Sequence, residues 1–87
     1  MSNDILSEKD QRAVEDILID KLAVTREQLT PESRIMEDLG ADSLHLMEIL
    51  IEVEDQFDVS FPTEQGSEVA TVGDVFKTLA ENLPRPR

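Results

Sequence analysis

Apolar residues recur at helical spacing in three separate segments of this chain, and this periodicity is the strongest constraint on its fold. The segments cover residues 8 to about 23, 43 to about 58, and 72–83. Ser, Thr or Asp stands immediately before each segment, where its side chain can accept a hydrogen bond from a free backbone N–H group. The pattern therefore predicts three substantial helices.

The composition favours helices packed on helices over a sheet. The chain has three Phe, no Tyr and no Trp, so its core must be aliphatic. Periodicity fails from Val24 to Asp42, which predicts a long loop, and at most a short helical turn is expected between Thr63 and Val69 after Pro62. We predict an all-α fold: a small four-helix bundle of three main helices plus one short helix, with a long loop between helices one and two.

With 87 residues, the chain has enough material for a single core, so we expect one domain over residues 1–87. Residues 1–6 and 84–87 are expected to be flexible termini. A loop as long as the predicted one is unusual in so small a domain, so it is either functional or packed down by its own apolar residues. Five are available: Val24, Leu29, Ile35, Met36 and Leu39.

Negative charge is concentrated in the middle of the chain. The net charge is −12, and the interval from Ile35 to Phe76 holds eleven carboxylates and neither Lys nor Arg. Such a field repels nucleic acid and anionic membrane surfaces and attracts basic protein surfaces. We expect no nucleic-acid binding and no membrane insertion. The alternative to a charge that attracts basic partner proteins is a charge that only keeps the protein soluble.

The N-terminal residues lack the basic and apolar regions of a signal peptide, and no span of about 18 apolar residues occurs. Cys is absent, which excludes a disulfide framework, a thiolate metal site and a cysteine nucleophile within this chain. We expect a cytoplasmic monomer.

A helical wheel of residues 43–58 separates the apolar side chains into two groups. One group forms the face expected to pack into the core: Leu46, Ile49, Leu50, Val53 and Phe57. A second line, here called the outer stripe, lies away from the centre of that face: Leu44, Met47 and Ile51. Carboxylates flank the outer stripe on both sides: Glu48, Asp55, Glu54 and Asp58. The pattern predicts either a docking surface for a partner with basic residues or side chains covered by the long loop.

Either Asp42 or Ser43 can serve as the N-cap of this second helix. If Asp42 is the cap, the Ser43 hydroxyl is free at the positive end of the helix, where a phosphate ester is favoured. Ser43 is a poor nucleophile candidate, because the only histidine, His45, projects about 200° away around the helix. No metal site is expected, since a lone His and acids without calcium-loop spacing do not form one.

The stretch KLAVTREQLTPESRIMEDLGADSLHLMEILIEVEDQFDVSFP resembles acyl carrier proteins without an obvious gap. Its most specific parts are EDLGADSL at the start of the second helix and FDVSFP at its end. The resemblance continues through EVATVGDVF into the last helix, so it extends from about Ser7 to Leu83.

The resemblance implies that Ser43, the serine of DSL, carries 4′-phosphopantetheine transferred from CoA, with Asp42 and Leu44 beside it in the attachment site. The thiol of this arm holds acyl groups as thioesters, so the protein would be a carrier and cosubstrate, not an enzyme. The implied partners are a phosphopantetheinyl transferase (holo-synthase), ketosynthases, reductases, dehydratases and acyltransferases of fatty acid or specialised lipid or polyketide biosynthesis.

The resemblance also implies roles for two sets of side chains. Partner enzymes are expected to contact Leu44, Met47, Glu48, Ile51, Glu54 and Asp55. The acyl chain is expected to be lined by Leu46, Ile49, Leu50, Val53, Phe57, Val75 and Leu79.

The sequence departs from the family at His45, where general fatty-acid members commonly have an acidic or small polar residue. The alternative function is an acidic helical interaction module that uses the outer stripe without a cofactor.

Overall fold

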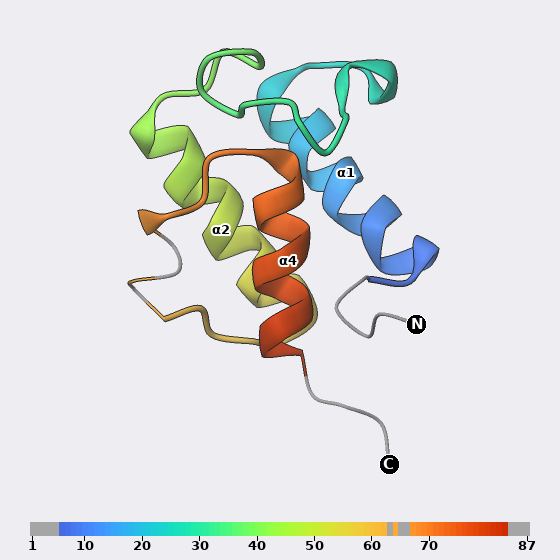
Figure 1. Ribbon diagram of the computed structural model, residues 1–87, viewed down its shortest axis with the longest axis vertical. Helices are drawn as coiled ribbons and strands as arrows, with labels where there is room; N and C mark the ends of the chain where they lie inside the picture. The colour runs from blue at the N-terminus through green and yellow to red at the C-terminus, as the bar shows by residue number, and fades with distance from the viewer. Residues whose placement is uncertain (1–5, 63, 65–66, 84–87) are drawn as a thin grey trace.

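The computed structural model describes residues 6–62, 64 and 67–83, and these residues form a helical protein (Figure 1). The regular elements are α1 (Glu8–Leu22), the 3₁₀ turn η1 (Arg26–Gln28), α2 (Ser43–Phe57) and α4 (Val72–Asn82). Within the described residues there is no strand, and the only bridge pairs Arg34 with Thr71. The all-α prediction and its three main helices are confirmed.

The predicted fourth helix is not confirmed. The short turn expected between Thr63 and Val69 involves residues 63, 65 and 66, which lie outside the described part of the chain. Glu64 and Ser67 have helical backbone, and the Ser67 hydroxyl donates to the Glu64 carbonyl oxygen over 2.9 Å. The other short element, η1, is a three-residue 3₁₀ turn.

The main helices begin at the caps that the sequence places there. Ser7 Oγ accepts from the Asp10 N–H over 3.2 Å at the start of α1. At the start of α4, Thr71 Oγ1 accepts from the Asp74 N–H and Asp74 Oδ2 accepts from the Thr71 N–H, each over 3.1 Å. These side chains satisfy backbone donors that have no partner inside the helix, which is why the helices start at these residues.

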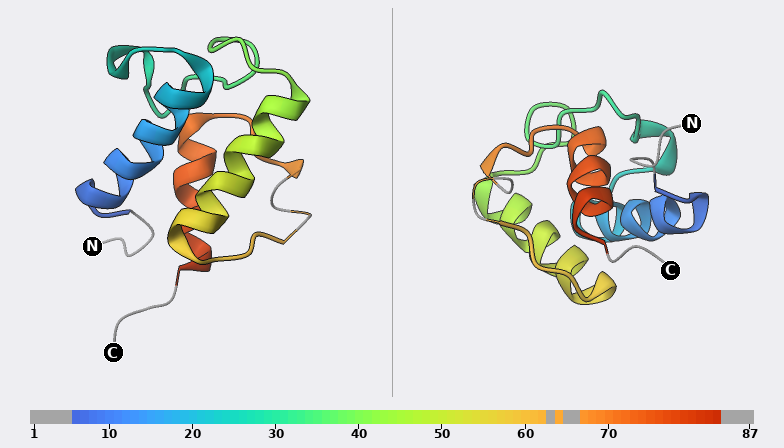
Figure 2. Two further views of the ribbon diagram at one scale, coloured as in Figure 1. Left: turned by 180° about the vertical axis from the view of Figure 1, so that it is seen from behind. Right: turned by 60° about the horizontal axis from the view of Figure 1, so that its bottom comes forward.

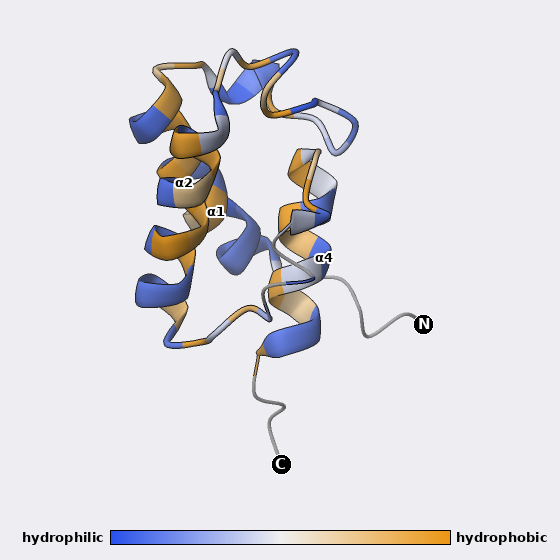
Figure 3. Cartoon of the chain, turned by 90° about the vertical axis from the view of Figure 1, so that its left-hand side faces the viewer, coloured by the Kyte–Doolittle hydropathy of each residue, from blue (hydrophilic) through white to orange (hydrophobic). Residues whose placement is uncertain are grey.

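The helices enclose an aliphatic core. α1 and α2 contact each other, and α4 lies against this pair, between the two helices in Figure 1 and in both views of Figure 2. Hydropathy colouring shows hydrophobic residues along much of α2, with hydrophilic ones between them (Figure 3). The fully buried large side chains are Leu18, Ile35, Ile49, Leu79, Val14, Val53, Val72 and Val75. Burying each contributes about 1.5–3 kcal/mol, so these side chains hold the helices together.

Leu6 lies at the inner end of the N-terminal segment that the sequence predicts to be flexible. It is buried in the core, and its carbonyl oxygen accepts from the Gln11 side-chain amide over 3.0 Å. Residues 1–5 and 84–87, which make up the rest of the predicted flexible termini, lie outside the described residues.

Three backbone hydrogen bonds attach the loop before α2 to the start of α4, and we call them the loop strap. The Val72 N–H donates to Ser33 O and the Gly73 N–H to Pro31 O, both over 3.0 Å, and the Ile35 N–H donates to Ala70 O over 2.9 Å. The loop strap closes the end of the bundle at which α2 and α4 both begin (Figure 1).

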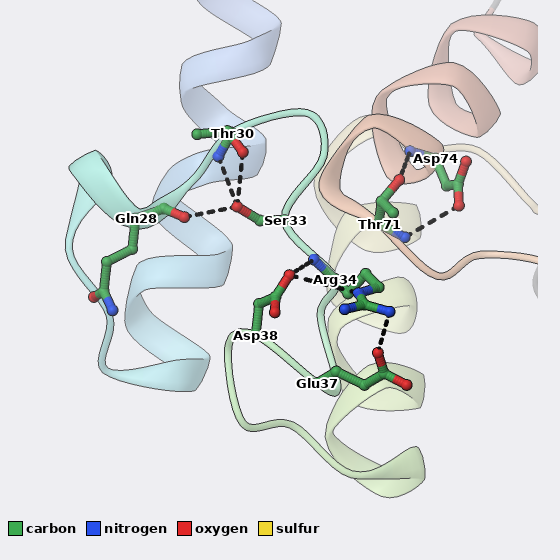
Figure 4. A network of polar contacts seen from close by, with 8 residues as sticks. All are labelled: Gln28, Thr30, Ser33, Arg34, Glu37, Asp38, Thr71 and Asp74. Carbon is green, nitrogen blue, oxygen red and sulfur yellow. Dashed lines mark hydrogen bonds and ion pairs between the residues drawn. The ribbon is translucent and has the colours of Figure 1, made fainter.

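Side-chain contacts reinforce the same loop (Figure 4). The Ser33 hydroxyl donates to Gln28 O over 2.8 Å and accepts from the Thr30 N–H over 3.0 Å. The Arg34 guanidinium pairs with Glu37 and Asp38. The chain therefore satisfies polar groups locally in a segment that has almost no regular structure.

Packing of the loop by its own apolar residues is confirmed for Ile35 and Leu39, which are buried, and in part for Val24 and Leu29, which pack against the core. Met36 is different. Its side chain is 43% exposed, so its expected contribution to loop packing was wrong. In the turn after Ile35, successive side chains point in different directions and only some can reach the core.

None of the described helices is long and apolar enough to cross a membrane.

Replacing Gly73 tests the loop strap. A Cβ at this position would lie 2.9 Å from Pro31 O and 3.4 Å from Pro31 Cβ, so Gly73→Ala must push the loop away from α4. Alanine is the better helix former by about 1 kcal/mol, yet we expect a net loss of about 1–3 kcal/mol in the free energy of unfolding, measured by urea titration. The exposed change Lys77→Ala on the same helix is the control, with an effect within about 0.5 kcal/mol. A more stable Gly73→Ala protein would contradict the prediction.

Candidate functional site

The start of α2 resolves the choice between the two possible caps. Asp42 is the N-cap: its Oδ1 accepts from the His45 N–H over 2.9 Å. Ser43 is therefore the first helical residue, and its side chain is exposed with no hydrogen bond to any other described residue. Gly40, with φ of +82°, turns the chain just before this cap.

Asp42 also contacts the His45 side chain, whose Nδ1 lies 3.0 Å from the same oxygen, Oδ1. The bond from the His45 backbone N–H is the main reason why the pKa of Asp42 is lowered from its ordinary value of 3.8, and the contact with the His45 side chain acts in the same direction. The carboxylate is thus stabilised in its ionised form. Because the His45 ring is turned toward Asp42, the pair formed by Ser43 and His45 does not have the geometry of a serine nucleophile and its base.

The outer stripe is exposed along its whole length. Leu44 is 64% exposed, Met47 58% and Ile51 53%. The long loop therefore does not cover these side chains, and this excludes the second of the two alternatives that the helical wheel left open. Three large apolar side chains on one exposed line are unusual on a small protein and typically mark a contact surface.

The carboxylates beside the outer stripe differ in what they contact. Glu48, Asp55 and Asp58 are exposed and have no side-chain hydrogen bond or ion pair to a described residue. Glu54 is half-buried, and its Oε2 accepts from the Phe61 N–H over 2.7 Å. Glu54 therefore holds the segment after α2 in place, a function that the sequence reasoning missed because the partner is a backbone group seven residues away.

The seven side chains predicted to line an acyl chain lie in one cluster. Ile49 and Val53 of α2 are buried together with Val75 and Leu79 of α4. Leu46, Leu50 and Phe57 are partly buried and pack against the same core. These residues belong to the aliphatic core that α2 and α4 share. Their role as a lining stays a prediction.

No group of three or more Asp, Glu or His side chains within the described residues is arranged to hold a metal ion.

Like the bond from Phe61 to Glu54, the contact between Asp42 and His45 was not predicted from the sequence. Its i, i+3 spacing at the start of a helix was a readable signal.

The site combines an exposed serine at the first position of a helix with an exposed apolar line and carboxylates along that helix, as expected of a small helical carrier protein. The chain matches the family described as the phosphopantetheine attachment site over residues 12–79. The chain belongs to this family, whose members carry a phosphopantetheine arm.

The relatives agree with this assignment. An acyl carrier protein of Syntrophobacter fumaroxidans is 42% identical over 72 residues, which cover 83% of this chain and 89% of the relative. An acyl carrier protein of Amoebophilus asiaticus is 42% identical over 78 residues, covering 90% and 96%. The structure of an acyl carrier protein from Enterococcus faecalis superimposes with a TM-score of 0.75 at 28% identity, covering 94% of this chain and 99% of that protein.

The residues at the start of α2 fit the arm. The Ser43 hydroxyl is exposed and makes no hydrogen bond to the described part of the chain, and it lies at the positive end of α2, where a phosphodiester is electrostatically favoured. The arm brings a thiol to a chain that has no Cys.

Replacing Asp42 tests the electrostatics of this helix start. Because the pKa of Asp42 is lowered in the folded protein, its ionised form stabilises the fold above the ordinary value, and this stabilisation is lost as pH falls through the lowered pKa. Asp42→Asn keeps an equally good cap without the charge. We expect this variant to be less stable than the wild type at pH 7, by a margin that narrows as the pH falls below the ordinary value of 3.8, measured by urea titration. A difference that does not change with pH would contradict the prediction.

Proposed function

We propose that Ser43 is the attachment site of 4′-phosphopantetheine and that the protein carries acyl intermediates as thioesters on this arm. The observation that supports this most strongly is the exposed, uncommitted hydroxyl of Ser43 at the first position of α2 in a chain of the phosphopantetheine-attachment family. Asp42 and Leu44 would flank the arm at its point of attachment. The arm would supply the thiol, and the protein would act as a cosubstrate of other enzymes, not as a catalyst.

The partners that fit the surface are enzymes with an apolar patch bordered by Arg and Lys. A phosphopantetheinyl transferase would load the arm from CoA, and ketosynthases, reductases, dehydratases and acyltransferases would act on its cargo. Leu44, Met47 and Ile51 would contact the apolar patch. Exposed carboxylates contribute little affinity individually, so they would mainly steer and orient the partner.

The names of the relatives bear on the biosynthetic pathway in which the protein would act. The relatives named acyl carrier proteins support a place in fatty acid biosynthesis, or in the synthesis of a specialised lipid or polyketide. The segment around Glu64 and Ser67 would complete a four-helix bundle, and the protein would act as a cytoplasmic monomer. The acyl chain would lie between α2 and α4 after the side chains of the core move apart.

A second candidate function is an acidic interaction module that binds partners without a cofactor. The exposure of all three residues of the outer stripe favours contact with a partner whether or not Ser43 is modified. The two functions differ in their dependence on Ser43, because only the carrier requires its hydroxyl.

Intact-mass analysis tests the carrier function. After incubation with CoA, Mg²⁺ and a promiscuous phosphopantetheinyl transferase, the wild type should gain one phosphopantetheine group. Ser43→Ala should gain none because the accepting oxygen is absent. Ser60→Ala is the matched control, since Ser60 is also exposed and its loss should leave loading unchanged. Loading of Ser43→Ala, or no loading of the wild type, would refute the assignment. Undiminished partner binding and full function of Ser43→Ala in cells would favour the interaction module.

Substitution of the flanking carboxylates tests how the partner is oriented. Glu48→Gln and Asp55→Asn remove exposed charges that have no ion pair within the described residues, and each should lower the association rate with the transferase by about two- to fivefold at low salt. Glu54→Gln keeps an oxygen that can accept from the Phe61 N–H. Its effect on the association rate should be smaller, because the Glu54 carboxylate is half-buried and already accepts this hydrogen bond. Surface plasmon resonance at low and high ionic strength measures these rates. Equal losses for all three variants would show that the contact of Glu54 with Phe61 does not limit its availability to partners.

A further inference from the structure

In two capped elements the side chain of the third residue accepts a hydrogen bond from the N-cap backbone, and α2 differs from both. In α4, Asp74 Oδ2 accepts from the Thr71 N–H over 3.1 Å, and in η1, Gln28 Oε1 accepts from the Thr25 N–H over 2.8 Å. In α2, the third residue donates through its backbone N–H, and its ring lies close to the cap carboxylate. His45 contacts the Asp42 carboxylate through its backbone N–H over 2.9 Å and through Nδ1 over 3.0 Å, both at the same oxygen.

This double contact matters because the neighbouring residue could replace Asp42 as the cap. Serine is about as good an N-cap as aspartate. If the helix began one residue later, Ser43 Oγ would accept from the Leu46 N–H, which in the structure donates to Asp42 O over 3.0 Å. The Ser43 hydroxyl would then be committed to capping, and its oxygen would be a poorer acceptor for a phosphoryl group.

We propose that His45 is a positioning residue for the modification of Ser43: its two contacts with Asp42 fix the start of α2 and leave the Ser43 hydroxyl free. The proposal rests on the proposed function of Ser43 as the attachment site. In the transfer, Ser43 Oγ loses its proton and bonds to the phosphorus of CoA that bears pantetheine, and adenosine 3′,5′-bisphosphate leaves. His45 takes no part in this chemistry and acts only through Asp42.

A double-mutant cycle between the two residues tests this coupling. The measured quantity is kcat/KM for loading with CoA and a promiscuous transferase, followed by intact mass. His45→Ala should lower it about three- to fivefold, the effect of losing one close contact between exposed polar groups, although alanine favours the helix. In the Asp42→Ala background, the same change at position 45 should have less than about a twofold effect, because its partner is gone.

His45→Asn should restore most of the loading rate. Its amide keeps a side-chain N–H donor at position 45 that can donate to the Asp42 carboxylate. Gln56→Ala, an exposed change on the same helix, is the control and should load at the wild-type rate. Amide hydrogen exchange provides a measurement without the transferase: the N–H at position 45 should exchange faster after His45→Ala only when Asp42 is present.

The outcomes separate the two proposals. If the wild type does not load, the attachment site at Ser43 is wrong. If the wild type loads and His45→Ala loads equally well, the attachment site stands and the positioning role is refuted. An equal loss in both backgrounds would also refute it, since His45 would then act independently of Asp42, for example by touching the transferase.

Discussion

The loop strap is the interaction on which the rest of the structure depends. Most of the residues between α1 and α2 lie outside regular structure, so their backbone groups need partners elsewhere. The first N–H groups of α4 have no acceptor within their own helix. Pro31 O and Ser33 O accept from these groups, and the Ile35 N–H donates to Ala70 O. Each segment thus supplies the partners that the other lacks, and the loop and the start of α4 stabilise each other.

The loop strap also decides what α2 exposes. Ile35, whose N–H is part of the loop strap, is fully buried, and Leu39 is buried in the same core. The apolar side chains of the loop are therefore used in the interior, and the outer stripe remains uncovered. A helix with one buried face and one exposed apolar line serves two purposes at once. Ile49 and Val53 attach it to the bundle, and Met47 and Ile51 remain available to another protein.

The fold was largely predictable because its local signals are strong. Ser7 and Thr71 cap the helices that follow them, and the wheel assigned Ile49 and Val53 to the core correctly. The parts of the site that could not be predicted depend on contacts that periodicity does not report. The Glu54 carboxylate accepts from a backbone N–H in the segment after α2, and a wheel places a side chain on a face without saying what it will bond. Met36 was misjudged for a similar reason, since no period applies in a turn.

By itself the sequence determined the three helices, their caps, the aliphatic core and the position of the carboxylates, because each of these follows from short-range spacing along the chain. It also limited the start of α2 to Asp42 or Ser43. The structure decided between them through a local hydrogen bond from the His45 N–H to Asp42. Only the tertiary structure left the outer stripe exposed, because the apolar side chains of the long loop that are buried, Ile35 and Leu39, pack into the core. That packing is set by distances between groups far apart in the sequence.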